Sequence, residues 1–394
     1  MSNDHDRYFE TARSGDPVAL AQLLVAIPSV NPALSPSGTG EATVAAVCAE
    51  LLEGWGFDVE MPEAAPGRPN VVARLDGAGA TTLLLNGHMD TVGAEGMTIP
   101  PFSARILGSR LLGRGSCDMK GGVAALLATS RRLALGGPRP RLVVLLTADE
   151  EHASLGMEAA VEDATADMAV VCEPTELAVM PAHKGFVWVK AVFEGRAAHG
   201  SLPKEGIDAI RHAALFVSAL DRYAASLGER PAHPLLGSPS IHTGTIAGGT
   251  APSVYPDHCE VQLECRTMPG TAPDSVLAEL TEILEDVRRS EPALRASLEV
   301  TLARPGTEVP SDARLVGALL EASRRHGLTA DVRGMTAWVD AAFLNEAGIP
   351  AVCFGPGSTV QAHTADEWID VAEIRKCADV LETFARSLTG STLG

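Results

Sequence analysis

Residues 142–152 read Leu-Val-Val-Leu-Leu-Thr-Ala-Asp-Glu-Glu-His, an apolar run followed at once by ionisable side chains. Continuous apolar runs of this length are typical of strands buried on both faces, as in parallel sheets. Two further runs have the same form: Thr82–Leu85 precedes Gly87-His88-Met89-Asp90, and Met168–Val171 precedes Glu173. Because parallel strands end at one rim of a sheet, we expect these polar residues to meet where open α/β sheets bind ligands.

The apolar pattern changes at about residue 180. Before it, helical spacing over residues 41–55 alternates with the buried strands, as in doubly wound α/β proteins. After it, we expect a strand at 186–193, a helix at 207–227, strands at 241–246 and 258–266, a helix at 275–289 and a strand at 297–302. This βαββαβ order is the ferredoxin-like arrangement.

The α/β pattern then returns, with helices near 315–325 and from about 371 and a strand at 351–354. The predicted fold class is therefore α/β. Residues 1–179 and 303–394 are expected to form a doubly wound, mostly parallel sheet domain, and residues 180–302 an inserted ferredoxin-like domain.

Composition excludes several classes of protein. The 394 residues hold 31 Lys+Arg against 50 Asp+Glu, a net charge of −19 that would repel phosphate backbones, so no nucleic-acid partner is expected. No apolar stretch reaches the roughly 18 residues that cross a bilayer, so no membrane is expected. The acidic opening, Met1–Arg7, differs from the basic and then apolar opening of a signal peptide, and we expect a cytoplasmic protein.

The cysteines predict neither disulfides nor a cysteine-rich zinc site, because there are seven of them, scattered and without a CxxC pair. Cys117 and Cys172 lie beside candidate ligands, which leaves a cysteine nucleophile with a histidine base as a rival hypothesis. Buried cysteine is more often a small apolar residue.

The ionisable residues of the predicted rim form one candidate site. They are His88, Asp90, Asp118, Glu150, Glu151, Glu173 and, later in the chain, His363. So many carboxylates and imidazoles in one place would repel and desolvate one another unless cations held them. Zn²⁺, Co²⁺ or Mn²⁺ accept mixed nitrogen and oxygen ligands, and a carboxylate can bridge two such ions about 3.5–4 Å apart. We therefore expect two divalent metal ions, with Zn²⁺ the first candidate.

Adjacent Glu150 and Glu151 suggest a division of roles, because successive residues leaving a strand face opposite ways. One can bind metal while the other acts as a base on the attacking water. Asp90 could accept the imidazole N–H of His88 and fix its tautomer. The alternatives are structural: the glutamates as a solvated turn, and Asp118 as a helix cap.

Five motifs in order resemble those of a known family. They are Gly87–Asp90, Gly113–Gly122, Thr147–Glu151, Cys172–Thr175 and Ala362–Glu367, within a match from about Leu83 to Trp368. Together they resemble the dinuclear metallopeptidase and deacylase family that includes acetylornithine deacetylase, succinyl-diaminopimelate desuccinylase, aminoacylase and glutamate carboxypeptidase.

The resemblance implies a role for each rim residue. Asp118 would bridge the two metals, His88 and Glu173 would complete one site, and Glu151 and His363 the other. In addition, Glu150 would be the general base and acid, with Asp90 orienting His88.

The resemblance also implies that the inserted domain is a lid that mediates a homodimer. In it, His199 of Gly195–Pro203 would stabilise the oxyanion, often in the partner subunit, and Arg266 would bind the substrate carboxylate. One departure concerns Ser253, which stands where the family usually has Asn before Val-x-Pro, so that its contacts to substrate would have shorter reach.

The resulting prediction is a metal-dependent amidohydrolase that releases an acyl group, acetyl first, from a small N-acyl amino acid such as N-acetylornithine. A desuccinylase, a dipeptidase or a carboxypeptidase using the same centre is the alternative within catalysis. A non-catalytic binding protein on the same fold is the alternative outside it.

Overall fold

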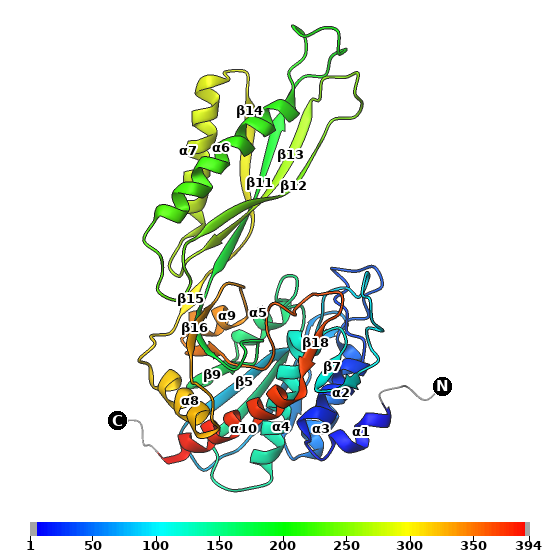
Figure 1. The fold of residues 1–394 in the computed structure, drawn as a ribbon, viewed down its shortest axis with the longest axis vertical. Helices are drawn as coiled ribbons and strands as arrows, with labels where there is room; N and C mark the ends of the chain where they lie inside the picture. Colours follow the sequence, from blue (N-terminus) through cyan, green and yellow to red (C-terminus); the bar gives the residue numbers. More distant parts are fainter. Residues whose placement is uncertain (1–5, 391–394) are drawn as a thin grey trace. The chain divides into compact units, whose positions relative to one another are not determined.

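A computed structural model describes residues 6–390, which form two compact units (Figure 1). Unit 1 comprises the chain up to Pro181, Val309–Arg333 and the chain from Val339 onward. Unit 2 comprises Ala182–Glu308 and Gly334–Trp338. The first unit is therefore built from three separate parts of the chain.

Unit 1 contains a mixed sheet in the order β1-β4-β8-β5-β9-β17-β10. Its strands are β1 (Asp58–Glu60), β4 (Val71–Leu75), β5 (Thr82–His88), β8 (Arg141–Thr147), β9 (Met168–Val171), β10 (Val179–His183) and β17 (Ala351–Cys353). The central strands β8, β5, β9 and β17 are parallel to one another, whereas the pairs at either side are antiparallel. From Ala182 onward β10 pairs with β15 (Thr307–Glu308) within unit 2.

The register of the parallel strands sets the position of the candidate site. Residues of β5 and β8 pair from Thr82↔Arg141 to His88↔Thr147, and Asn86 of β5 pairs with Val171 of β9. The segments that follow Thr147 and Val171 therefore leave the sheet at the same rim as His88. The predicted meeting of the polar strand ends rests on this register.

Helices cover one face of this sheet and form the main core (Figure 1). They are α2 (Pro17–Ala26), α3 (Ala42–Gly54), α4 (Gly121–Ala134), α8 (Arg314–Arg325) and α10 (Val371–Ser387). Asp16 begins α2 by accepting hydrogen bonds from the amides of Val18 and Ala19, at 3.0 and 2.8 Å, and Pro17 suits the first helical position.

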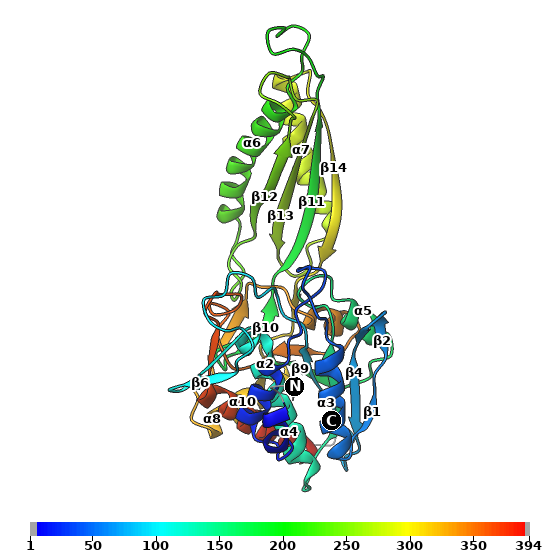
Figure 2. The ribbon, with the colours of Figure 1, turned by 90° about the vertical axis from the view of Figure 1, so that its right-hand side faces the viewer.

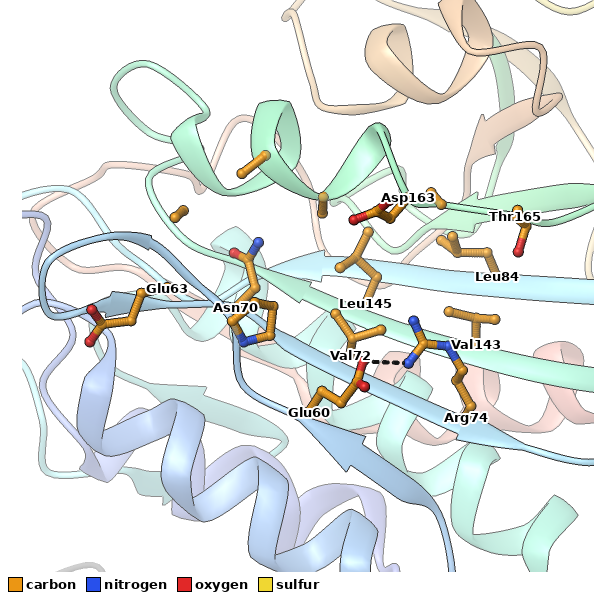
Figure 3. A pocket seen from close by; sticks show the side chains of 15 residues that line it. Glu60, Glu63, Asn70, Val72, Arg74, Leu84, Val143, Leu145, Asp163 and Thr165 are labelled. Carbon is orange, nitrogen blue, oxygen red and sulfur yellow. Dashed lines mark hydrogen bonds and ion pairs between the residues drawn. The ribbon is translucent and has the colours of Figure 1, made fainter.

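The opposite face is covered by the shorter helices α5 (Leu155–Val161) and α9 (Ala341–Glu346). Leu84, Val143 and Leu145 of the sheet and Ala159 of α5 line a cavity of about 180 Å³ on this face (Figure 3). At its margin Arg74 and Glu60 form an ion pair at 2.7 Å. The alternation of side chains along a strand explains why Leu83 and Leu85 belong to the main core while Leu84 faces this cavity.

The remaining elements of the described chain are short. They are α1 (Asp6–Ala12), β2 (Glu63–Ala65), β3 (Arg68–Pro69), β6 (Arg105–Leu107), β7 (Arg110–Leu112), an irregular turn at Ser116–Lys120, β16 (Val332–Met335), β18 (Trp368–Asp370) and a 3₁₀ turn at Leu388–Gly390. Strands β18, β7 and β6 form a small antiparallel sheet.

Unit 2 is an antiparallel sheet with two helices on one face (Figure 2). Its elements follow the chain as β11 (Gly185–Glu194), α6 (Ala209–Glu229), β12 (Ser240–Gly248), β13 (His258–Thr267), α7 (Pro273–Ser290) and β14 (Arg295–Arg304). The strand order β12-β13-β11-β14 is that of a ferredoxin-like fold. Val187, Val189, Ala191 and Phe193 alternate along β11 and pack beneath the helices.

The predicted fold class is confirmed: an α/β unit around a parallel central sheet and a ferredoxin-like βαββαβ unit. The prediction did not include the antiparallel outer strands of the larger sheet. Among the described residues, no helix is both long and apolar enough to span a bilayer.

Candidate metal centre

The rim of the unit 1 sheet gathers all five predicted metal ligands. His88 ends β5, Glu151 follows β8, and Glu173 follows β9. Asp118 lies in the turn before α4, and His363 lies in the loop after β17. Two groups have ligand atoms within 4.8 Å of one another: His88 with Asp118 and Glu173, and Asp118 with Glu151 and His363.

Asp118 belongs to both groups and presents a different oxygen to each. Its Oδ1 lies 3.2 Å from Nε2 of His88, and its Oδ2 lies 3.3 Å from Nε2 of His363. Nε2 of His363 also lies 3.1 Å from Oε2 of Glu151. A carboxylate with one oxygen toward each of two imidazoles has the arrangement required of a bridging ligand.

The His88 ring is held so that Nε2 faces the other ligands. Its Nδ1 lies 3.0 Å from the main-chain oxygen of Asp90 and 3.5 Å from that residue's carboxylate. Since a carbonyl can only accept, Nδ1 carries a proton, and in the neutral ring Nε2 then has the lone pair that a metal ion needs. Asp90 thus orients His88 chiefly through its carbonyl, while its carboxylate accepts the amides of Glu150 and Glu151, at 3.1 and 3.2 Å.

The site holds more carboxylates than its two imidazoles could balance even if both were protonated. Burial raises the pKa of Glu150, opposed by His88 and reinforced by Glu173, Asp340 and Glu151. Burial and the Asp118 carboxylate likewise raise the pKa of Glu151. Moreover, Oε1 of Glu151 is buried without a hydrogen-bond partner. An unpartnered carboxylate oxygen beside two imidazoles fits a site for divalent cations.

The carboxylates in turn raise the pKa of the two imidazoles, which favours the protonated rings. Burial alone would lower the pKa of His88, but Asp118, Asp90, Glu150 and Glu173 outweigh it and raise the pKa. Hydrogen bonds to Asp118 and Glu151 raise the pKa of His363 to about 10. His363 has a left-handed φ of 62° and a side chain that is 50% exposed, so it approaches the carboxylates from the open side of the centre.

Glu367 secures the turn that carries Asp118, a role the sequence analysis did not identify. Its Oε1 accepts the amides of Cys117 and Asp118, at 2.8 and 3.1 Å, and its Oε2 accepts Gly115 N at 2.9 Å and Nη1 of Arg114 at 2.8 Å. Because Glu367 follows His363 in one loop, it ties two ligand-bearing loops together. Its place at the end of the Ala362–Glu367 motif was the available signal.

Asp340 is a second residue that the sequence analysis did not place in the centre. It is 1% exposed, its Oδ2 accepts Thr147 Oγ1 at 3.0 Å, and its Oδ1 has no hydrogen-bond partner. Burial raises its pKa to about 7 despite the opposing charge of His88. The Asp340 carboxylate in turn contributes to the raised pKa of Glu150.

The thiols beside the ligands do not support the cysteine-nucleophile hypothesis. Cys117 and Cys172 are buried, and burial with the neighbouring Asp118 and Glu173 raises their pKa. A thiol needs a lowered pKa to attack as thiolate, so both behave as small core residues.

The remaining predicted residues, His199, Ser253 and Arg266, lie in unit 2. The first two are neighbours: the backbone of His199 bridges to Val254, and Gly200 N donates to Ser253 O at 2.8 Å. Ser201 N donates to His199 Nδ1 at 3.2 Å, which places the proton of the neutral ring on Nε2. The side chains of His199 and Ser253 are exposed.

Arg266 stands apart from that pair, on β13. Its Nη2 forms an ion pair with Glu264 at 2.8 Å, and its guanidinium lies 5.7 Å from the ring centre of Phe186. The predicted carboxylate-binding residue is therefore already engaged by an internal carboxylate, and the predicted role requires Arg266 to share or exchange that partner.

An α/β sheet that brings a carboxylate between two imidazoles, with further glutamates, to one rim has the arrangement typical of dinuclear metal-dependent hydrolases. The chain belongs to peptidase family M20/M25/M40, whose family model matches residues 84–387. It is accordingly a hydrolase of that family, in agreement with the resemblance of the five motifs.

Relatives and solved structures agree with this assignment. An acetylornithine deacetylase from Myxococcus xanthus is 32% identical over 84% of this chain and 88% of its own length. A tripeptidase from Staphylococcus aureus, 22% identical, superposes with a TM-score of 0.81 over 96% of this chain and 99% of its own. A dinuclear metal-binding M20 peptidase from Bacillus subtilis, 16% identical, superposes with a TM-score of 0.73 over 97% and 100%. At these identities the two structures show a shared fold.

Proposed function

We propose that this protein hydrolyses the amide bond of small N-acyl amino acids, with acetyl as the acyl group and N-acetylornithine as the first substrate to test. The observation that carries the proposal is the position of Asp118 between His88 and His363. The carboxyl of Glu150 lies close to His88, outside hydrogen-bond distance. The similarity to acetylornithine deacetylases supports the choice of substrate.

His88, Asp118 and Glu173 would hold one ion, and Asp118, Glu151 and His363 the other. Zn²⁺ is the first candidate, with Co²⁺ or Mn²⁺ as alternatives, because the donors are nitrogen and oxygen only. When bound, two such ions supply Lewis-acid polarisation of the scissile carbonyl and acidify the attacking water.

Glu150 is the residue assigned to proton transfer. Its Oε2 lies 3.9 Å from Nε2 of His88, outside hydrogen-bond distance, so it faces the centre without being committed to that ring. It would take the proton of the attacking water and return it to the leaving nitrogen. The raised pKa of this buried carboxyl suits the return, since the protonated form must persist until the amine departs.

His199 and Arg266 of unit 2 are assigned to the substrate. With its proton on Nε2, the neutral His199 ring is a hydrogen-bond donor for a developing oxyanion. Arg266 would bind the substrate carboxylate, and Ser253, beside His199, would add a hydrogen bond. In this proposal residues 180–302 act as a lid and as the contact of a homodimer, and the protein works in the cytoplasm.

The testing experiment measures metal content and acetate release from N-acetylornithine for the wild-type chain and Glu150→Gln. We expect about two ions per chain in both proteins and a loss of activity of about 10²–10⁴-fold in the variant. Glu162→Gln, which changes an exposed glutamate at the end of α5, is the matched control and should retain activity.

The alternatives are separated by a panel of N-succinyl amino acids and dipeptides. Hydrolysis of either in place of N-acetylornithine would keep Glu150 and the metal residues and replace the substrate by that of a desuccinylase, dipeptidase or carboxypeptidase. Two bound ions without hydrolysis of any member would favour a binding protein, and a chain that takes up no Zn²⁺, Co²⁺ or Mn²⁺ would refute the proposal.

A further inference from the structure

The turn that presents Glu150 and Glu151 is held by four buried or mostly buried side chains to which none of the roles above is assigned. These are Asn31, Glu41, Arg68 and Asp149, which we call the positioning cluster. Asn31 lies in the loop after α2, Glu41 directly before α3, Arg68 in β3 and Asp149 two residues after the end of β8. Four separate segments of unit 1 thus converge on one turn.

Asn31 joins the cluster to the metal centre. Its side-chain Nδ2 donates to Asp90 Oδ2 at 2.8 Å and to Asp149 Oδ1 at 3.0 Å. Its Oδ1 accepts Ala33 N at 2.9 Å, which fixes which way the amide faces. A fully buried amide between two carboxylates offers each of them a hydrogen and adds no charge.

Asp90 passes this restraint to the two glutamates. The carboxylate that accepts from Asn31 also accepts the main-chain amides of Glu150 and Glu151, at 3.1 and 3.2 Å. The position of the Asp90 carboxylate therefore helps to fix the main-chain positions of Glu150 and Glu151. A shift of the Asn31 amide would move both backbones together.

Asp149 and the Arg68–Glu41 pair hold the other side of the turn. Asp149 has a φ of 68°, a conformation that Asp and Asn adopt more readily than other residues with a side chain. Arg68 binds Glu41 through Nε and Nη2, both at 2.5 Å, and its Nη2 also reaches Asp149 Oδ1 at 3.0 Å. Glu41 accepts Asp149 N at 3.3 Å, so the carboxylate and the amide of Asp149 are both held.

We infer that Asn31, Asp149 and the Arg68–Glu41 pair are positioning residues for the general base Glu150. They act through Asp90 and the main chain of the 149–151 turn, without touching the metal ligands' donor atoms or the reacting groups. The inference rests on the proposed function for its kinetic part, and on the hydrogen-bond geometry alone for its structural part.

The positioning cluster should affect the rate of the reaction more than the binding of substrate. Because hydrolysis needs Glu150 within hydrogen-bond reach of a water and Glu151 at a metal, small displacements of their shared turn should slow the reaction more than they weaken substrate binding. Substitutions in the cluster should consequently lower kcat and leave KM nearly unchanged.

The test compares Asn31→Ala and Arg68→Met with Arg68→Lys and with Arg74→Met. Lys keeps the charge but not the two-pronged contact with Glu41, so it should restore part of the lost activity. Arg74 is the matched control, since it forms a single exposed ion pair with Glu60, at the margin of the cavity in Figure 3. Metal content, kcat and KM on the hydrolysed substrate, and amide hydrogen exchange over residues 148–152 are measured for each.

We expect kcat to fall about 10- to 100-fold in Asn31→Ala and Arg68→Met, with KM changed less than about 3-fold and two ions retained. Exchange of the Glu150 and Glu151 amides should accelerate at least about 10-fold, while the α4 segment 121–134 exchanges as in the wild type. Arg74→Met should match the wild type in every measurement.

Unchanged exchange over 148–152 in both variants would overturn the inference, as would an equal acceleration in α4, which would indicate general destabilisation. A rise in KM with kcat unchanged would also contradict it. If the wild-type chain hydrolyses no substrate of the panel, the proposed function fails first. Amide exchange and metal content then decide the positioning role alone, because neither requires turnover.

Discussion

Two histidines of this protein are equally buried and yet have opposite acid–base behaviour. His88 ends β5 in unit 1 and His183 ends β10 in unit 2, and each is 2% exposed. The pKa of His88 is raised well above its ordinary value, whereas that of His183 is lowered to about 4. Burial disfavours the charged imidazole at both positions, so their surroundings account for the difference.

Carboxylates surround one ring and not the other. Asp118, Asp90, Glu150 and Glu173 all act on His88. His183 has its Nδ1 3.0 Å from the main-chain oxygen of Lys184, its Nε2 unpartnered, and the ring of Trp338 edge-on at 6.3 Å. A histidine at a strand end is therefore a candidate metal ligand only where other strand ends bring carboxylates to it, and is otherwise a neutral residue of the core.

The largest effect expected on this pair of histidines comes from exchanging each ring for an amide. His88→Asn should lose the ion held with Asp118 and Glu173 and lower activity at least about 10²–10³-fold, the range for removing one group that stabilises the transition state. His183→Asn should keep both ions. Mass spectrometry of metal content and initial rates measure both. Equal metal loss in the two variants would contradict the comparison, because it would show that the carboxylates around His88 do not set it apart from His183 as a metal ligand.

A second prediction concerns pH and unit 2. His183 takes up a proton near pH 6.5 when unfolded and near pH 4 when folded, so between these values the unfolded chain binds more protons. The contribution of His183 to stability is fully present above pH 6.5 and is lost as the pH falls toward 4, about 3–4 kcal/mol in total at about 1.4 kcal/mol per pKa unit. His183→Leu should remove this contribution.

Urea unfolding of the wild type and His183→Leu at about pH 7 and about pH 4.5 measures it. The free energy of unfolding should fall less steeply toward acid in the variant, with metal content unchanged. Parallel pH dependences in the two proteins would mean that the folded protein protonates His183 as readily as the unfolded chain does.

The contrast also explains what could be predicted from sequence. Continuous apolar runs identified the central strands, because a strand with both faces covered, such as Leu142–Leu146, is apolar at every position. Their common direction then brought His88, Glu151 and Glu173 to one rim. The outer strands β1 and β10 were missed because β1 has three residues, two of them acidic, and β10 contains Pro181, which argues against a strand.

The supporting residues escaped prediction for a different reason. Asn31, Arg68 and Asp340 reach the centre only through tertiary packing, and nothing beside them in the chain marks them as buried or paired. Ligand residues follow buried strands or lie in recognisable motifs, whereas a residue that orients them can come from any loop. The identities and charges of a site are therefore more predictable from sequence than the hydrogen bonds that hold it.

The smallest effect we predict tests this support at Asp118, the group that most distinguishes His88 from His183. In Glu367→Gln an NH₂ replaces one of the two oxygens that accept four donors, so at least one donor of the Gly115–Asp118 turn or of Arg114 loses its acceptor. With Asp118 less firmly placed, metal affinity should weaken about 10- to 100-fold, measured by competition with a chromogenic chelator.

Glu373→Gln is the matched control, because Glu373 accepts a single main-chain amide, from Gly357 at 2.7 Å, and its remaining oxygen can still accept after substitution. Its metal affinity should stay within about 3-fold of the wild type. Equal affinities in Glu367→Gln and the wild type would mean that the ions themselves fix Asp118. The carboxylates around His88 would then be arranged by metal binding rather than by the fold, and the difference between the two histidines would be complete only in the loaded protein.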